Sequence, residues 1–206
     1  MATNLAVSRF TEAEYLAFER ASQEKHEFVN GEILDMTGTS RAHSLIAWNI
    51  AGKLHSHLAG RPCEAHVGDM RLNVSDTGAY VYPDVLVVCG EVQVRDGFVD
   101  TLMNPTLVIE ILSPSTEAYD RGPKSAHYRR LASLQGYVLI AQDRASVEHF
   151  RREGDFWILT EATDLDATMP LPEIGCELKL SEVYERVEFP EPTEESPDAP
   201  LQPHPA

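Results

Sequence analysis

The chain has 206 residues, of which 43% are hydrophobic, so its length and composition suit one domain with an ample core. The three cysteines, Cys63, Cys89 and Cys176, are odd in number, far apart and without a CxxC pair. That usage favours reduced thiols and a cytoplasmic location over a disulfide framework. No basic stretch precedes an apolar one at the start, and no run of eighteen apolar residues occurs, which argues against secretion and membrane spanning.

The formal net charge of −16 argues against a nucleic-acid partner, because Lys and Arg contacts to phosphate dominate such binding. Part of this charge belongs to the residues after 187, which include five acids before Pro200 and no Lys or Arg. A local basic patch formed by Arg121, Lys124, Arg129 and Arg130 would matter more than the sum. Any DNA binding is therefore expected to be weak and sensitive to salt.

The N-terminal part predicts a helix followed by a hairpin. Residues 1–9 are expected to be disordered, and Thr11 with Glu14 forms a capping-box pattern that starts a helix over 11–19. Tyr15 and Phe18 are its expected core residues. Residues 26–36 predict a hairpin of two strands around an Asn-Gly turn. Its Glu27 is either a further metal ligand or a member of a surface ion pair.

The next segments predict a helix and two strands. Residues 40–58 place apolar side chains at helical spacing behind a Thr39 or Ser40 cap. Residues 64–74 and 79–89 predict strands separated by a turn, and residues 91–100 predict a polar loop. Asp69, in the first of these strands, is expected either to pair with an arginine or to hold the residues of a functional site in place without contacting a ligand itself.

Two short apolar runs each carry one acid. Glu110 lies inside the run 106–112, which is rich in β-branched residues and predicts a buried strand. Asp84 follows Pro83 and leads directly into a second such run, 85–88. A buried carboxylate usually pairs, becomes neutral or binds a metal. If the two strands are neighbours, Asp84 and Glu110 converge on one hard cation such as Mg²⁺.

A cation follows these acids along the chain. After the break at 113–116, Lys124 begins a predicted helix that places His127 and Tyr128 on the same face. Lys124 therefore lies near the two carboxylates. Tyr128 either orients that lysine, contacts phosphate or packs in the core.

The C-terminal part predicts a strand over 136–141, a hairpin over 147–159, a short strand over 176–178 and a helix near 183–184. A Pro-rich acidic tail, 188–206, is expected to be disordered. The fold class is α/β, mixed, over residues 10–187. A central mixed sheet contains the strands of Val85, Leu107 and Val138, helices from Ser40 and Pro123 flank it, and additional β-hairpins lie at its edges.

These residues carry a resemblance. Pro83-Asp84, then Glu110 in an apolar strand, then a lysine, resemble the PD-(D/E)XK nuclease superfamily. The strings HEFVNGEI (26–33), EILSPST (110–116), YDRGPK (119–124) and HYRR (127–130) are similar to a bacterial family of restriction-endonuclease-like proteins. The resemblance covers residues 10–185 and implies a restriction-endonuclease-like core.

The resemblance also implies a site. Asp84, Glu110 and the backbone carbonyl of Ile111 would hold Mg²⁺ or Mn²⁺, and Lys124 would be the third catalytic residue. The superfamily lysine normally lies two residues after the glutamate, where this chain has Leu112, so the resemblance implies that Lys124 supplies the charge from the following helix. Glu27, His43 and Tyr128 are supporting candidates. A histidine occupies the place of His43 in that family, where it either approaches the site or caps and packs locally.

The function expected from this site is metal-dependent endonuclease activity on DNA, carried out by a homodimer. Two other functions stay open. One is a catalytically idle dimeric binding or regulatory module of the same fold, which the acidic balance and the absent lysine after Glu110 favour. The other is a hydrolase of small phosphorylated substrates, which the negative charge suits.

Overall fold

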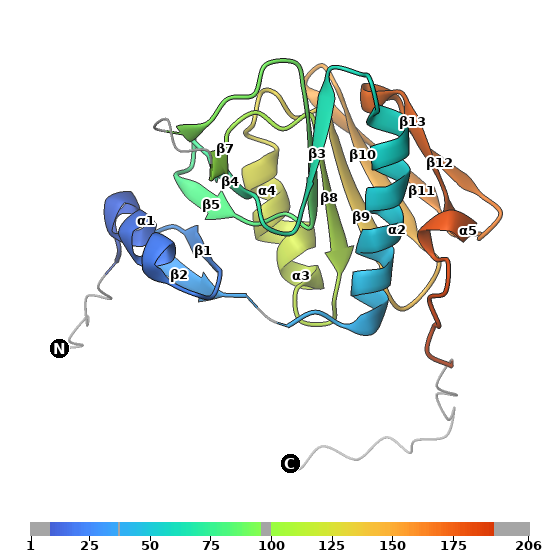
Figure 1. The fold of residues 1–206 in the computed structure, drawn as a ribbon, viewed down its shortest axis with the longest axis horizontal. Helices are drawn as coiled ribbons and strands as arrows, with labels where there is room; N and C mark the ends of the chain where they lie inside the picture. The colour runs from blue at the N-terminus through green and yellow to red at the C-terminus, as the bar shows by residue number, and fades with distance from the viewer. Residues whose placement is uncertain (1–8, 37, 96–99, 192–206) are drawn as a thin grey trace, which may run out of the picture.

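The computed structural model describes residues 9–36, 38–95 and 100–191, and its centre is a six-stranded sheet (Figure 1). The predictions of disorder for residues 1–9 and 188–206 fall almost entirely outside this part. The strand order is β11-β10-β9-β8-β6-β3. The bounds are β3 Cys63–Val67, β6 Val85–Cys89, β8 Leu107–Leu112, β9 Gly136–Ala141, β10 Val147–Glu153 and β11 Phe156–Ala162.

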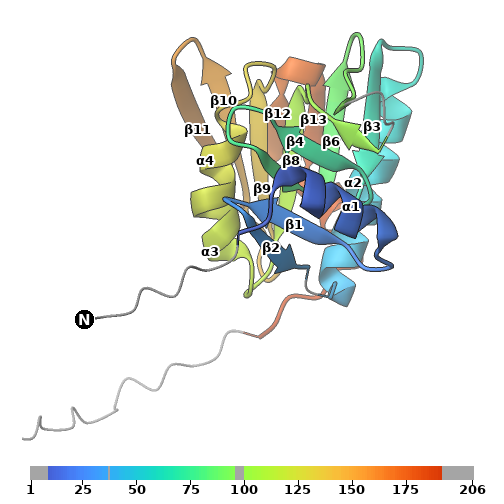
Figure 2. The same ribbon diagram turned by 90° about the vertical axis from the view of Figure 1, so that its left-hand side faces the viewer.

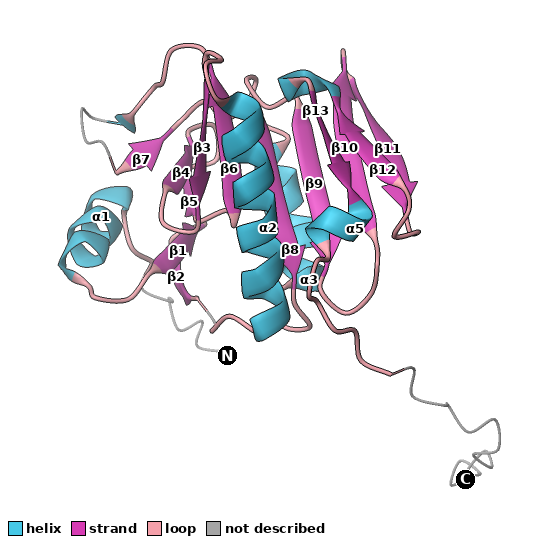
Figure 3. Ribbon diagram, turned by 45° about the vertical axis from the view of Figure 1, so that its right-hand side comes forward, coloured by secondary structure: helices cyan, strands magenta, loops and turns pink. Residues whose placement is uncertain are grey.

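The central strands are apolar on both faces because helices cover both faces. Leu107, Ile109 and Ile111 of β8 pack with α2 (Arg41–Leu58), while Val108 and Leu112 pack on the opposite side. That side is covered by a helical segment made of α3 (Glu117–Tyr119), the π-helical turn η2 (Asp120–Lys124) and α4 (Ser125–Tyr128). Figures 2 and 3 show the sheet between these two layers. The predicted mixed α/β architecture and the neighbouring β6, β8 and β9 strands are confirmed.

A second sheet of five strands lies beside the first, in the order β2-β1-β5-β4-β7. The bounds are β1 His26–Val29, β2 Glu32–Asp35, β4 Arg71–Val74, β5 Ala79–Val81 and β7 Thr101–Leu102. The prediction of single strands over 64–74 and 79–89 is wrong. Each divides into two strands of different sheets, because the chain bends at Gly68, where φ is +73°, and at Pro83, which has no N–H to donate.

The N-terminal helix and hairpin form as expected. Helix α1 (Glu12–Ala21) has a complete capping box between Thr11 and Glu14. Positive φ angles at Asn30 (+53°) and Gly31 (+85°) turn β1 into β2, as the Asn-Gly pair predicts. Tyr15 is fully buried, but the core prediction for Phe18 is wrong, since 43% of it is exposed.

The C-terminal part closes the core on the α2 side. The β10–β11 hairpin extends the main sheet, while β12 (Thr168–Leu171) and β13 (Cys176–Lys179) form a two-stranded sheet around the 3₁₀ turn η3 (Pro172–Ile174). Helix α5 (Leu180–Val183) follows. Among the described residues, no helix is both long and apolar enough to cross a membrane.

The prediction of three reduced thiols is wrong for two of the cysteines. Cys63 of β3 and Cys89 of β6 are directly opposed in the antiparallel pair and form a disulfide. Their separation along the chain hides this pairing, because only the folded sheet brings them together. Cys176 is a free buried thiol. The cytoplasmic location stays a prediction. The argument from reduced thiols that supported it now applies to Cys176 alone among the three cysteines.

Candidate active site

Two acids come together where the chain passes between the sheets. Asp84 lies in the crossover from β5 to β6, and Glu110 lies in the middle of β8, on the face that packs against α4. The N–H of Asp84 donates to Glu110 Oε2 at 3.3 Å, and the N–H of Ile111 donates to Asp84 Oδ2 at 2.7 Å. Neighbouring strands β6 and β8 therefore bring the two carboxylates close together, as the sequence predicts.

Glu110 is almost fully enclosed, with 3% of its surface exposed. Its Oε1 accepts a hydrogen bond from Tyr128 Oη at 2.6 Å and forms an ion pair with Lys124 Nζ at 2.9 Å. Burial raises the pKa of Glu110 to about 8, with the Lys124 ammonium opposing the rise and Asp84 and Asp120 adding to it. A carboxyl with this pKa keeps a proton at neutral pH unless another cation replaces that proton.

Lys124 reaches the site from the end of the π-helical turn. Pro123 cannot donate an N–H, and the wider turn accommodates it inside a continuous helical segment. Lys124 and Tyr128, four residues apart, both point at Glu110. The prediction that His127 shares this face is wrong, because its Nδ1 contacts Thr77 Oγ1 at 2.8 Å. The predicted start of the helix at Lys124 is also wrong, since helical structure begins at Glu117.

Three carboxylates surround the Lys124 ammonium. Nζ lies 3.0 Å from Glu27 Oε1 and 3.6 Å from Asp120 Oδ1, besides its contact with Glu110. Burial opposes the charge of Lys124, but these three carboxylates hold its pKa well above the ordinary value. Asp120 was missed in the sequence, although its i, i+4 spacing to Lys124 is a usable signal. Glu27 pairs with a cation, but it does so in the buried site and not on the surface.

His43 approaches Asp84 from the first turn of α2. The Ser40 hydroxyl caps this helix by accepting from the His43 N–H at 3.0 Å, and it also donates to Gln142 Oε1. The ring Nε2 of His43 lies 3.1 Å from Asp84 Oδ2, whereas Nδ1 is buried and has no hydrogen-bond partner among the residues that the structure describes. Of the two readings from the sequence, the structure thus places the imidazole at the acid pair.

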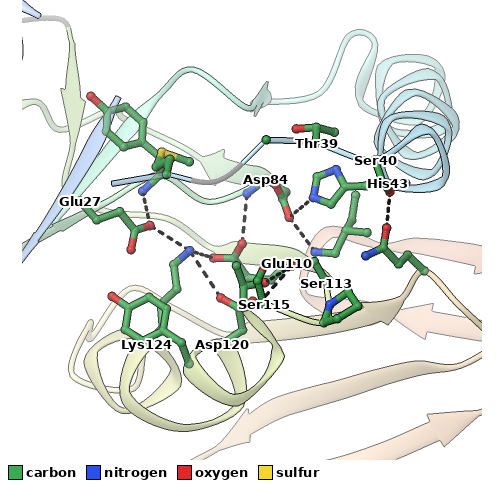
Figure 4. A pocket seen from close by; sticks show the side chains of 18 of the residues that line it. Glu27, Thr39, Ser40, His43, Asp84, Glu110, Ser113, Ser115, Asp120 and Lys124 are labelled. Atoms are coloured by element: carbon green, nitrogen blue, oxygen red, sulfur yellow. Dashed lines mark hydrogen bonds and ion pairs between the residues drawn. The ribbon is translucent and has the colours of Figure 1, made fainter. Parts of the chain in front are cut away.

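A cavity of about 440 Å³ opens over these groups (Figure 4). Its lining includes Glu27, His43, Asp84, Glu110, Asp120 and Lys124. Tyr128 lies below Glu110, fully buried and outside the lining, so it orients the carboxylate instead of contacting a substrate.

Asp69 and the predicted basic patch do not belong to the cavity. Asp69 is exposed and pairs with Lys25 at 2.7 Å, not with an arginine. Arg121 pairs with Glu117 and, through two nitrogens, with Glu148. Arg129 donates to Ser125 Oγ, and Lys124 is buried. Arg121 and Lys124 are therefore paired with acids, whereas Arg129 and Arg130 are exposed outside the cavity lining.

The donor set around Asp84 and Glu110 fits a hard divalent cation. All the side-chain contacts recorded for Asp84 among the described residues use Oδ2, which leaves Oδ1 for a ligand bond. In the same part of the chain, no three His, Cys, Asp or Glu side chains form a metal-binding group. Two carboxylates with waters and a backbone oxygen suit Mg²⁺, which seldom uses a cage made only of side chains.

The family model for Uma2, described as "Putative restriction endonuclease", matches residues 12–181. The chain belongs to the Uma2 family. The chain is similar in sequence to two proteins from Synechocystis sp., "Uncharacterized protein sll1609" and "Uncharacterized protein slr1290". The first is 39% identical over 73% of this chain and 86% of its own length, and the second is 35% identical over 85% and 92%.

A solved structure agrees with this assignment at the level of the fold. The crystal structure of a "putative nuclease belonging to DUF820" from Anabaena variabilis superposes with a TM-score of 0.71 and 20% identity, over 85% of this chain and 97% of that one. The resemblance read from the sequence is therefore confirmed: this Uma2 chain has a restriction-endonuclease-like, nuclease-type fold.

Proposed function

We propose that the protein is a metal-dependent endonuclease that hydrolyses DNA phosphodiester bonds with Asp84, Glu110 and Lys124. The observation that carries the proposal is the convergence of these residues, from a crossover, a strand and a helical turn, in one cavity. Family membership supports nuclease chemistry in general. The residue roles, the metal and DNA as substrate are parts of the proposal.

Asp84 and Glu110 would hold Mg²⁺ or Mn²⁺ together with the Ile111 carbonyl. Because N–H and C=O of one residue in an extended strand point to the same side, the bond from Ile111 N–H to Asp84 supports that third ligand. Such a cation polarises a phosphoryl oxygen and makes a bound water acidic.

The other residues hold the reacting groups in place. Tyr128 fixes the rotamer of Glu110, and Glu27 and Asp120 hold the Lys124 ammonium beside it. The charged Lys124 would stabilise the negative charge that develops on the phosphate. Glu27 Oε1 also accepts from the N–H of Tyr82, which ties the lysine to the crossover that carries Asp84.

One observation favours the second candidate, a catalytically idle binding module. Lys124 Nζ contacts three carboxyl groups, so its charge is already balanced in part before any substrate enters. A metal ion would change this balance by drawing Glu110 toward itself. The melting temperature with Mn²⁺ separates the candidates, since a ligand that binds only the folded state raises it. An absent shift favours the idle module.

The test is cleavage of supercoiled plasmid DNA at low salt with Mg²⁺, Mn²⁺ or EDTA. We expect nicking that needs the metal and is lost in Asp84→Asn, Glu110→Gln and Lys124→Ala. Asp69→Asn is the matched control, because Asp69 also adjoins a strand but contacts Lys25 outside the cavity. Full cleavage by Asp84→Asn or Glu110→Gln, with the fold intact by circular dichroism, would refute the assignment.

We also propose a homodimer joined through β11. This seven-residue strand is an edge of the main sheet and exposes Phe156 (75%), Ile158 (42%) and Leu159 (51%). The proposed partner of this edge is β11 of a second copy of the chain, because a two-fold axis places two identical edge strands side by side and antiparallel. Light scattering should report twice the chain mass, and Ile158→Lys should halve it. A monomeric parent chain would contradict this proposal.

A further inference from the structure

Of the three reactive groups, Glu110 and Lys124 lie buried at the floor of the cavity, whereas Asp84 is partly exposed in its lining. Glu110 is 3% exposed and Lys124 is 5% exposed. The cavity of about 440 Å³ above them falls in the size range of pockets for small ligands, roughly 300–1,000 Å³. A phosphodiester therefore has to enter the cavity to meet these residues.

Two walls limit what can enter. The end of β2 with residues 38–40 forms one wall, and residues 113–116, directly after β8, form the other (Figure 4). Proteins that recognise duplex DNA present wide surfaces, on the order of 1,000–2,500 Å². An unpaired strand is narrower and more flexible than a duplex, so it brings a phosphate between these two walls more readily than a rigid duplex does.

The charges of the lining also disfavour a duplex. Among the described residues that line the cavity, Lys124 is the one Lys or Arg, while five side chains carry carboxyl groups. Three of these carboxyl groups already contact Lys124. Duplex binding depends on Lys and Arg contacts along the backbone, and this lining does not supply them.

The lining carries neutral hydrogen-bonding groups where a duplex-binding surface would carry Lys and Arg. Ser113 Oγ lies 3.0 Å from both Ser115 Oγ and Thr116 Oγ1, and Ser40 bonds Gln142 on the other side of the cavity. Hydroxyl and amide groups can donate to and accept from the sugar, the phosphate and the edge of a base. The partly exposed Tyr119 adds an aromatic ring to the lining, and rings of this kind stack on unpaired bases.

We propose that the substrate is an unpaired DNA strand, such as a single strand or an overhang, and that one nucleotide of it occupies the cavity next to the acid pair. This inference rests on the proposed function and adds the class of substrate to it. Unpaired bases enter a pocket without the cost of breaking a base pair and a stack.

The test compares three fluorescent oligonucleotides of one sequence: a single strand, a blunt duplex and a duplex with an overhang. Fluorescence anisotropy with Ca²⁺ in place of Mn²⁺ measures binding, and sequencing gels with Mn²⁺ map the cuts. We expect the single strand and the overhang to bind on the order of tenfold more tightly than the blunt duplex. Cuts should lie only at unpaired nucleotides.

A bulky side chain at the mouth of the cavity supplies the structural control. Ser115→Trp should weaken single-strand binding on the order of tenfold and keep the Mn²⁺ shift in melting temperature. Ser56→Trp is the matched control, because Ser56 is exposed on α2, lies outside the cavity lining and donates to the carbonyl of Gly52 in its own helix.

The outcomes separate this inference from the proposed function. Equal binding of the blunt duplex, or cuts inside the paired segment, with the Mn²⁺ shift present, overturns the inference and leaves the nuclease proposal in place. A wild-type protein without any Mn²⁺ shift overturns both. Equal affinity for a mononucleotide, with no oligonucleotide cut, points to a small phosphorylated substrate and also overturns the inference.

Discussion

The affinity of the site for Mg²⁺ should rise with pH, because a proton and the cation compete for Glu110. Burial raises the pKa of this carboxyl to about 8, and Lys124 only partly opposes the rise. At pH 7 about one molecule in ten would carry an ionised Glu110, so the dissociation constant should be about tenfold larger than its limit at high pH. At pH 6 a further factor of about ten is expected, since each pH unit corresponds to about 1.4 kcal/mol.

Calorimetric titration with Mg²⁺ from pH 6 to pH 9 measures this dependence directly. Repeating the titration in two buffers of different ionisation enthalpy counts the protons released, and about 0.9 proton per bound ion is expected at pH 7. Glu110→Gln is the control, because its side chain does not titrate and any remaining affinity should be independent of pH. An affinity that is constant from pH 6 to pH 8, or binding without proton release, would refute the reasoning.

Three further predictions concern stability. Because the folded-state pKa of Glu110 lies above its unfolded value, the metal-free protein should lose stability as pH rises from about 4.5 to about 8, and urea titrations should show a smaller loss in Glu110→Gln. Lys124→Met leaves buried carboxylates without their cation and should lower the free energy of unfolding by about 3–5 kcal/mol. The exposed-pair control Lys25→Met should change it by less than about 1 kcal/mol, and equal effects would contradict the buried role. Replacing both Cys63 and Cys89 by serine should cost about 3.5 kcal/mol, because the bridge closes a separation of 26 residues. An unchanged urea midpoint would show that the bridge does not stabilise the fold.

Local patterns in the sequence predicted most of the elements that surround the site. The apolar runs of β6, β8 and β9 predicted buried strands, and helical spacing behind Ser40 predicted α2. These signals are local, because strand and helix periods depend on residues a few positions apart. Asp84 and Glu110 could be singled out for the same reason, since a lone acid beside or within an apolar run is unusual in any fold.

Other features depend on how distant segments meet. Bends in the chain at Gly68 and Pro83 divide each long predicted strand between two sheets. The sequence does not say which sheet receives which half. The pairing of Cys63 with Cys89 follows from the register of β3 against β6, which no spacing rule contains.

The sequence by itself thus determined the fold class, the two acids and a lysine near them, because each follows from local hydrophobicity and charge. Only the tertiary structure decided that Lys124 is shared by Glu27, Glu110 and Asp120. It also decided that Arg121 and Lys124 are paired with acids, and that Asp84 and Glu110 lie in a cavity. The physical reason is that burial and electrostatic pairing are set by neighbours far apart in the chain, which are fixed only when the sheets and helices pack.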